Sequence, residues 1–124
     1  MFMLKINTKL NKQVYSETET KTNKVWINNK PIYRKVCKIS GSDLTQYTRY
    51  NPHLTDMDEL VYAGGTVYRK DEKWQILPTT YSSWEITFYD ITSGQISINF
   101  SGNQWGTAKI NYVYVIFEYT KTTD

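Results

Sequence analysis

Apolar and polar side chains alternate along the second half of the chain. The alternation is clearest from Trp84 to Asp90, and it returns over residues 95–100. A period of two residues is typical of a β-strand with one buried face and one exposed face. No window of the chain carries a sustained apolar stripe at helical spacing. The pattern therefore predicts an all-β protein.

The longest predicted strand covers residues 109–121 and is apolar on both of its faces. A strand that is buried on both faces is central in its sheet or lies against a neighbouring subunit. Alternate positions divide its side chains into two sets, with Ile110, Tyr112, Tyr114 and Ile116 on one face and Val113, Val115, Phe117 and Tyr119 on the other.

Shorter strands are predicted around a pair of glycines. The segments on either side of Gly64 and Gly65 are strand-like, and the glycines suggest a β-bulge or a bend within one longer strand. A charged loop at residues 70–73 precedes another short strand, and a single helical turn is predicted over residues 44–50. Short strands with frequent turns predict an antiparallel β-sandwich of the jelly-roll type.

A β-hairpin is predicted over residues 25–36, where two β-prone runs flank a polar turn. Asn28 and Asn29 tolerate the left-handed backbone that a tight turn requires, and Pro31 sets φ where the second run begins. The chain is accordingly divided into an extended arm (1–24), a hairpin junction (25–39) and a β-sandwich body (40–124).

Charge supports this division. Residues 1–40 carry nine Lys or Arg against two Glu, a net charge of +7, whereas the remainder carries six basic against ten acidic residues, a net charge of −4. A basic portion on an acidic body suggests a docking end. The lysines are dispersed, so we expect no nucleic-acid partner.

No apolar run has the length of a signal peptide or a transmembrane helix, so we expect synthesis in a cytoplasm and no membrane insertion.

The residues offer little for catalysis. Cys37 is the only cysteine and His53 the only histidine, and neither stands in a motif for zinc binding or nucleophilic chemistry. We therefore expect no catalytic residue, no metal and no cofactor.

Eleven Tyr and four Trp exceed what a small core takes up. Because Tyr is enriched at interfaces, we expect some of them to lie between copies of the chain.

Two segments go beyond a generic β-protein. Residues 26–36, Trp-Ile-Asn-Asn-Lys-Pro-Ile-Tyr-Arg-Lys-Val, resemble a hairpin near the start of small structural proteins of tailed bacteriophages, which are head-fibre, tail-fibre or baseplate components. Residues 114–124, which end in Glu-Tyr-Thr-Lys-Thr-Thr-Asp, resemble the terminal strand of the same family. Asn29 stands where the family has a turn glycine, and Leu54 where it has a glycine after a Pro-His pair.

The resemblance implies a non-enzymatic virion fibre or adhesin module, made in the host bacterial cytoplasm and displayed on the head or tail. The expected partners are further copies of the chain, for which we favour a homotrimer over a dimer, and capsid or tail proteins that the arm and hairpin contact. The candidate docking residues are Lys5, Lys9, Lys12, Lys21, Lys24, Trp26, Tyr33 and Arg34.

Host-surface glycan binding by a tail or baseplate adhesin is the second hypothesis, and a glycan-degrading enzyme is the third. An aromatic ring can stack on the flat face of a sugar while Asn and Gln side chains bond its hydroxyls. The candidate glycan contacts are Trp105 with Asn103 and Gln104, and Tyr81 with Trp84.

Overall fold

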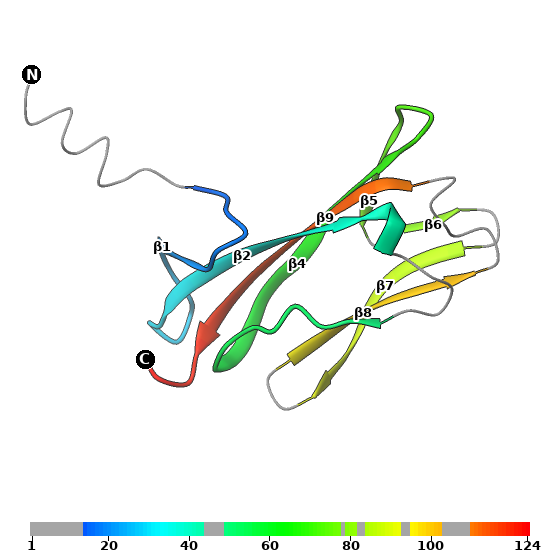
Figure 1. Ribbon diagram of the computed structural model, residues 1–124. Helices are drawn as coiled ribbons and strands as arrows, with labels where there is room; N and C mark the ends of the chain where they lie inside the picture. The colour runs from blue at the N-terminus through cyan, green and yellow to red at the C-terminus, as the bar shows by residue number, and fades with distance from the viewer. Residues whose placement is uncertain (1–13, 44–48, 78, 82–83, 93–94, 103–109) are drawn as a thin grey trace, which may run out of the picture.

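The computed structural model describes the backbone of residues 14–43, 49–77, 79–81, 84–92, 95–102 and 110–124. Its side chains are described for residues 14–43, 50–77 and 110–124. Nearly all of this backbone is antiparallel β-structure (Figure 1), with one short 3₁₀ turn, η1, at Gly41–Asp43. The all-β prediction is confirmed.

The strands form two sheets (Figure 1). The five-stranded sheet has the order β1 (Thr20–Val25), β2 (Pro31–Ser40), β9 (Ile110–Lys121), β4 (Met57–Arg69) and β5 (Trp74–Leu77). The four-stranded sheet has the order β3 (Arg49–Tyr50), β8 (Gln95–Gly102), β7 (Trp84–Thr92) and β6 (Thr79–Tyr81). The jelly-roll-like sandwich and the extended arm stay predictions. The helical turn predicted over 44–50 lies mostly outside the described residues, and its last two residues form β3.

Strand β9 is the centre of the larger sheet, with β2 and β4 as its neighbours. Its side chains alternate as predicted, but the two faces differ in burial. Val113, Val115, Phe117 and Tyr119 are 0 % exposed, whereas Tyr112, Tyr114 and Ile116 are half-buried. The pattern placed Ile110 on the same face as Tyr112, but Ile110 is fully buried and Tyr112 is not. Ile110 lies next to a shift in the register between β4 and β9.

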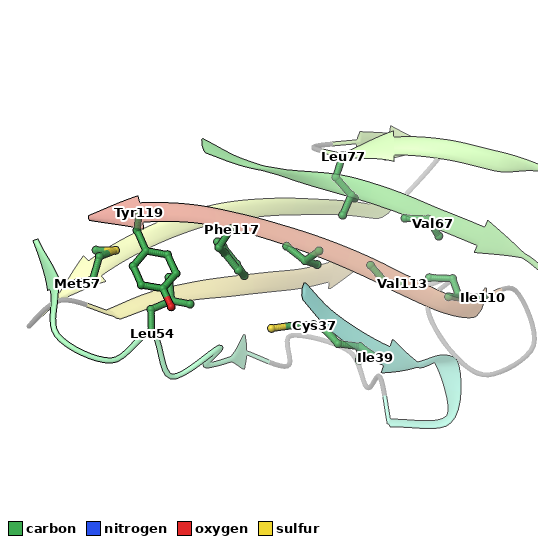
Figure 2. Close-up of a cluster of buried hydrophobic side chains, with 11 residues drawn as sticks. Cys37, Ile39, Leu54, Met57, Val67, Leu77, Ile110, Val113, Phe117 and Tyr119 are labelled. Atoms are coloured by element: carbon green, nitrogen blue, oxygen red, sulfur yellow. The ribbon is translucent and has the colours of Figure 1, made fainter. Parts of the chain in front are cut away.

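The hydrophobic core lies against the face of β9 that carries Phe117 and Tyr119. Figure 2 shows the Tyr119 ring pointing from β9 toward Leu54, and Met57 beside it. Burying a large apolar side chain contributes about 1.5–3 kcal/mol to folding, so this face supplies much of the stability of the sheet. Cys37 joins the cluster from β2, and its burial raises the pKa of the thiol.

A hairpin is present where it was predicted, but its first strand, β1, ends at Val25, so Trp26 and Ile27 lie in the connection and not in a strand. The Trp26 amide donates to the Lys30 carbonyl (2.9 Å), and the Asn29 amide donates to the Trp26 carbonyl (2.9 Å). Asn29 has a φ of 65°, the left-handed conformation expected for this turn.

The hairpin is part of the main sheet, which corrects its assignment as a junction outside the body. Strand β2 pairs with β9 continuously from Tyr33 to Ser40, and its Cys37 and Ile39 side chains enter the core. Strand β1 begins at Thr20, inside the segment predicted to be an arm. The body therefore does not begin at residue 40, because its central strand needs β2 as a neighbour.

The two adjacent glycines lie within β4, which runs unbroken for 13 residues. The register shifts of β4 against β9 fall elsewhere, so the glycines mark no bulge. Gly65 has a φ of 151°, and a Cβ there would lie 2.0 Å from the Tyr114 carbonyl oxygen. Gly65 thus permits a close approach between β4 and β9 that any other residue would obstruct.

Candidate binding surface on the five-stranded sheet

Aromatic side chains gather on the face of the five-stranded sheet opposite the core. Paired residues of neighbouring strands lie on the same face. Tyr112 on β9 pairs with Tyr68 on β4, which pairs in turn with Trp74 on β5. The Tyr68 ring centroid lies 4.5 Å from that of Trp74 and 5.3 Å from that of Tyr112. These rings and Tyr114, 5.1 Å from Tyr112, form what we call the aromatic row.

A lysine lies over one end of the aromatic row. The Lys38 ammonium group is 4.7 Å from the Tyr112 ring centroid and 5.6 Å from that of Tyr114. Both distances are within the range of cation–π attraction. The row therefore carries a positive charge at the β2 side of the sheet.

A groove with a volume of about 540 Å³ runs beside the aromatic row. Its floor is made by Val36 on β2 and Ile116 on β9, which are paired positions of the two strands. One wall is the segment before β1, which the Val36 amide holds by donating to the Ser16 carbonyl (3.0 Å). The groove is lined by Tyr15, Ser16, Glu17, Val36, Lys38, Thr66, Tyr114 and Ile116.

An ion pair lies below the same surface, between β2 and β9. Arg34 donates from Nε (3.1 Å) and Nη2 (2.8 Å) to one oxygen of Glu118, and Arg34 is only 4 % exposed. The Tyr15 ring covers the guanidinium group, with 4.2 Å between Cζ and the ring centroid. Arg34 Nη1 is buried and makes no hydrogen bond within the described part of the chain. The pair ties the groove wall to the central strand.

A second polar cluster joins the start of the described chain to its end. Glu19 accepts a hydrogen bond from the Tyr119 hydroxyl and pairs with Lys121 (2.6 Å). Burial, and then the bond to Glu19, raise the pKa of Tyr119 above its ordinary value. A hydrogen bond to Asp124 is the main cause that raises the pKa of Tyr33. These contacts hold the segment before β1 against β9.

The predicted docking lysines of the arm are only partly covered by the described residues. Lys5, Lys9 and Lys12 lie outside the described residues, and Lys21 and Lys24 are exposed on β1.

The predicted docking residues of the hairpin make contacts within the fold instead. The Trp26 indole donates to Glu59 (2.8 Å), and Tyr33 stacks on Tyr119 with centroids 6.3 Å apart. Arg34 is buried in the ion pair with Glu118, so its guanidinium group is not presented to a partner. This corrects its assignment to docking.

The predicted glycan contacts fall in the part of the chain that the structure describes least. Trp105, Asn103 and Gln104 lie outside the described residues. Tyr81 and Trp84 are directly paired across β6 and β7, as backbone positions. The aromatic row was not predicted as a site. Its only sequence signal is the series of tyrosines at even positions of the last strand.

The described residues bear on other kinds of site as well. Among residues 14–43, 50–77 and 110–124, no group of three or more His, Cys, Asp or Glu side chains could hold a metal ion. Within the described backbone, no helix is long and apolar enough to cross a membrane. The described lining of the groove holds one carboxylate, that of Glu17, whereas glycoside hydrolysis ordinarily uses two. Comparison of this chain with protein-family models, curated proteins and solved structures finds no match.

Proposed function

We propose that this chain is a non-enzymatic structural protein of a bacteriophage particle, a fibre or adhesin module that associates with copies of itself. The family assignment is supported by the resemblance of residues 26–36 and 114–124 to phage virion proteins. The module would be displayed on the head or tail, where the N-terminal part of the chain would contact capsid or tail proteins.

Self-association is supported by one observation, the exposed apolar edge of the five-stranded sheet. Trp74 is 53 % exposed and Ile76 is 79 % exposed, and both project from β5, the last strand in the sheet. An edge strand with exposed apolar side chains is a template for pairing with another chain. Trp is also enriched among the residues that dominate binding energy at interfaces. We favour a homotrimer over a dimer.

The oligomer is tested by measuring molar mass in solution with light scattering. The wild-type chain is expected to be an oligomer, and Ile76→Ser and Trp74→Ala are expected to shift it toward monomer. Ile27→Ser is the matched control, because Ile27 is 86 % exposed but lies in the hairpin turn, away from β5. A monomeric wild-type chain, or dissociation caused equally by Ile27→Ser, would reject the assignment of the interface to β5.

The virion location is tested separately, by labelling purified particles of the phage that encodes the chain. An antibody to the chain should decorate the head or the tail in electron micrographs. Particles without label, together with chain recovered only in the soluble fraction of the lysate, would exclude a structural role.

A further inference from the structure

We propose that the groove beside the aromatic row binds a chain of pyranose sugars with mainly equatorial hydroxyl groups. The proposal concerns β2, β9 and the segment before β1, and it does not depend on the phage assignment or on the β5 interface.

The groove has the size and composition of a ligand site. Its volume of about 540 Å³ lies within the roughly 300–1,000 Å³ typical of small-molecule sites. Apolar side chains form the floor, namely Val36 and Ile116, while the polar groups stand at the margins. A surface of this kind can take a ligand that is apolar on one face and hydroxylated at its rim.

A pyranose ring with equatorial hydroxyls has this character, because its C–H bonds point to both faces and its hydroxyls point outward. The Tyr114 ring provides an apolar platform at one wall, and Tyr15, 63 % exposed, provides another at the opposite wall. The hydroxyls of Ser16 and Thr66 can both donate and accept hydrogen bonds. The Glu17 carboxylate can accept them, and the Lys38 ammonium can donate them.

An extended peptide fits the groove less well. Peptides most often bind a sheet by adding a strand to a free edge. Strand β9, which runs under the groove, is paired with both β2 and β4, so its backbone groups are used within the sheet. At the outer side of β2, the pairing with β1 ends at Arg34, and the Val36 amide donates to the Ser16 carbonyl. A ligand that lies over β9 must therefore be recognised by side chains, and rings flanked by hydroxyl and charged groups suit a sugar.

The direct test is titration of the ¹⁵N-labelled full chain with cellohexaose and chitohexaose, followed by amide chemical shifts. We expect a Kd of about 1 mM or tighter for at least one of them. The shifts should centre on Val36, Thr66 and Ile116. The absence of binding by both hexasaccharides, or shifts that centre away from the groove, would overturn the proposal.

Substitutions of Tyr114 test whether its ring contacts the sugar. Tyr114→Ala should weaken binding roughly tenfold, as truncation of an aromatic anchor typically does, whereas Tyr114→Phe should bind as the wild type does. Because Tyr114→Ala could disturb the sheet, Lys38→Met, on the same wall, provides a second variant that should weaken binding. Wild-type affinity in both Tyr114→Ala and Lys38→Met would reject the site.

Hexasaccharide binding can be tested independently of self-association. Trp74→Ala lies outside the groove lining and should retain hexasaccharide binding even if it changes the molar mass. Loss of binding in Trp74→Ala but not in Tyr114→Ala would place the ligand at the β5 edge and so reject the groove.

Discussion

The Arg34–Glu118 ion pair allows a quantitative test of the fold. The Arg34 side chain is 5 % exposed and that of Glu118 is 16 % exposed, so both charges are largely removed from water. Removing one partner of a buried ion pair costs about 3–5 kcal/mol, because the other charge is left uncompensated. Domain stabilities are about 5–15 kcal/mol, so such a loss would be a large fraction of the whole.

The two single substitutions should differ in how much they lower the free energy of unfolding. Glu118→Leu leaves a buried guanidinium group, of which Nη1 already lacks a hydrogen-bond partner within the described residues, so we expect a loss of about 3–5 kcal/mol. Arg34→Met leaves the more exposed Glu118 carboxylate, which water can partly solvate, and should cost less. The double variant should recover most of the loss, since apolar replacement of a buried pair is often neutral or stabilising.

Urea denaturation followed by tryptophan fluorescence measures these differences. The single-variant cost of 3–5 kcal/mol corresponds to a fall in Tm of roughly 10–20 °C. A loss below about 1 kcal/mol in Glu118→Leu would show that the guanidinium group finds solvent or another partner. A double variant as unstable as Glu118→Leu would show that the two side chains do not act as a pair.

Four further predictions concern the backbone and two titrating groups. Asn29→Ala should destabilise the protein by about 1 kcal/mol and Asn29→Gly should not, because only alanine resists the left-handed φ; urea midpoints compare the two. Gly65→Ala should cost about 1–3 kcal/mol for its strained φ alone, with the clash against the Tyr114 carbonyl in addition, whereas Gly64→Ala should cost less because it meets the outer end of the Tyr62 side chain, which can move; equal urea midpoints would contradict this. The Cys37 thiol should react with iodoacetamide far more slowly in the native protein than in urea, because burial raises its pKa and limits access; equal rates would refute this. Stability should fall as the pH rises above the ordinary tyrosine pKa of 10.0, because the unfolded chain then loses a proton that folded Tyr119 retains; pH-dependent urea midpoints, with Tyr119→Phe as the control, measure this slope.

Local patterns were sufficient to predict the elements that carry an apolar alternation or a turn signal. The two faces of β9 follow from its alternating positions, and the conformation of Asn29 follows from its place in a polar turn. Strand β1 escaped prediction because its residues, Thr20–Val25, are mostly polar and exposed. It is stabilised instead by its pairing with β2 and by a hydrogen bond from the buried Thr22 hydroxyl to the Ile32 carbonyl (2.7 Å).

The candidate site depends on pairing between distant segments, which local patterns do not contain. Tyr68, Trp74 and Tyr112 form one row only because β4 pairs with both β5 and β9 in a particular register. A shift of one residue in either ladder would move these rings to the opposite face. The tyrosine count indicated excess aromatic surface, but only the register shows where that surface lies.

The two segments that resemble phage virion proteins are neighbours in the structure, which changes what their resemblance can mean. The hairpin supplies β2, the C-terminal segment supplies β9, and the two strands pair directly. Arg34 meets Glu118, and Lys30 donates to the Lys121 carbonyl (3.1 Å). The contacts within the fold therefore account for the polar residues at these positions, which join the first hairpin to the last strand. Contacts with a particle or a host must be sought on side chains that this pairing leaves exposed, and those of the groove and of the β5 edge meet that requirement.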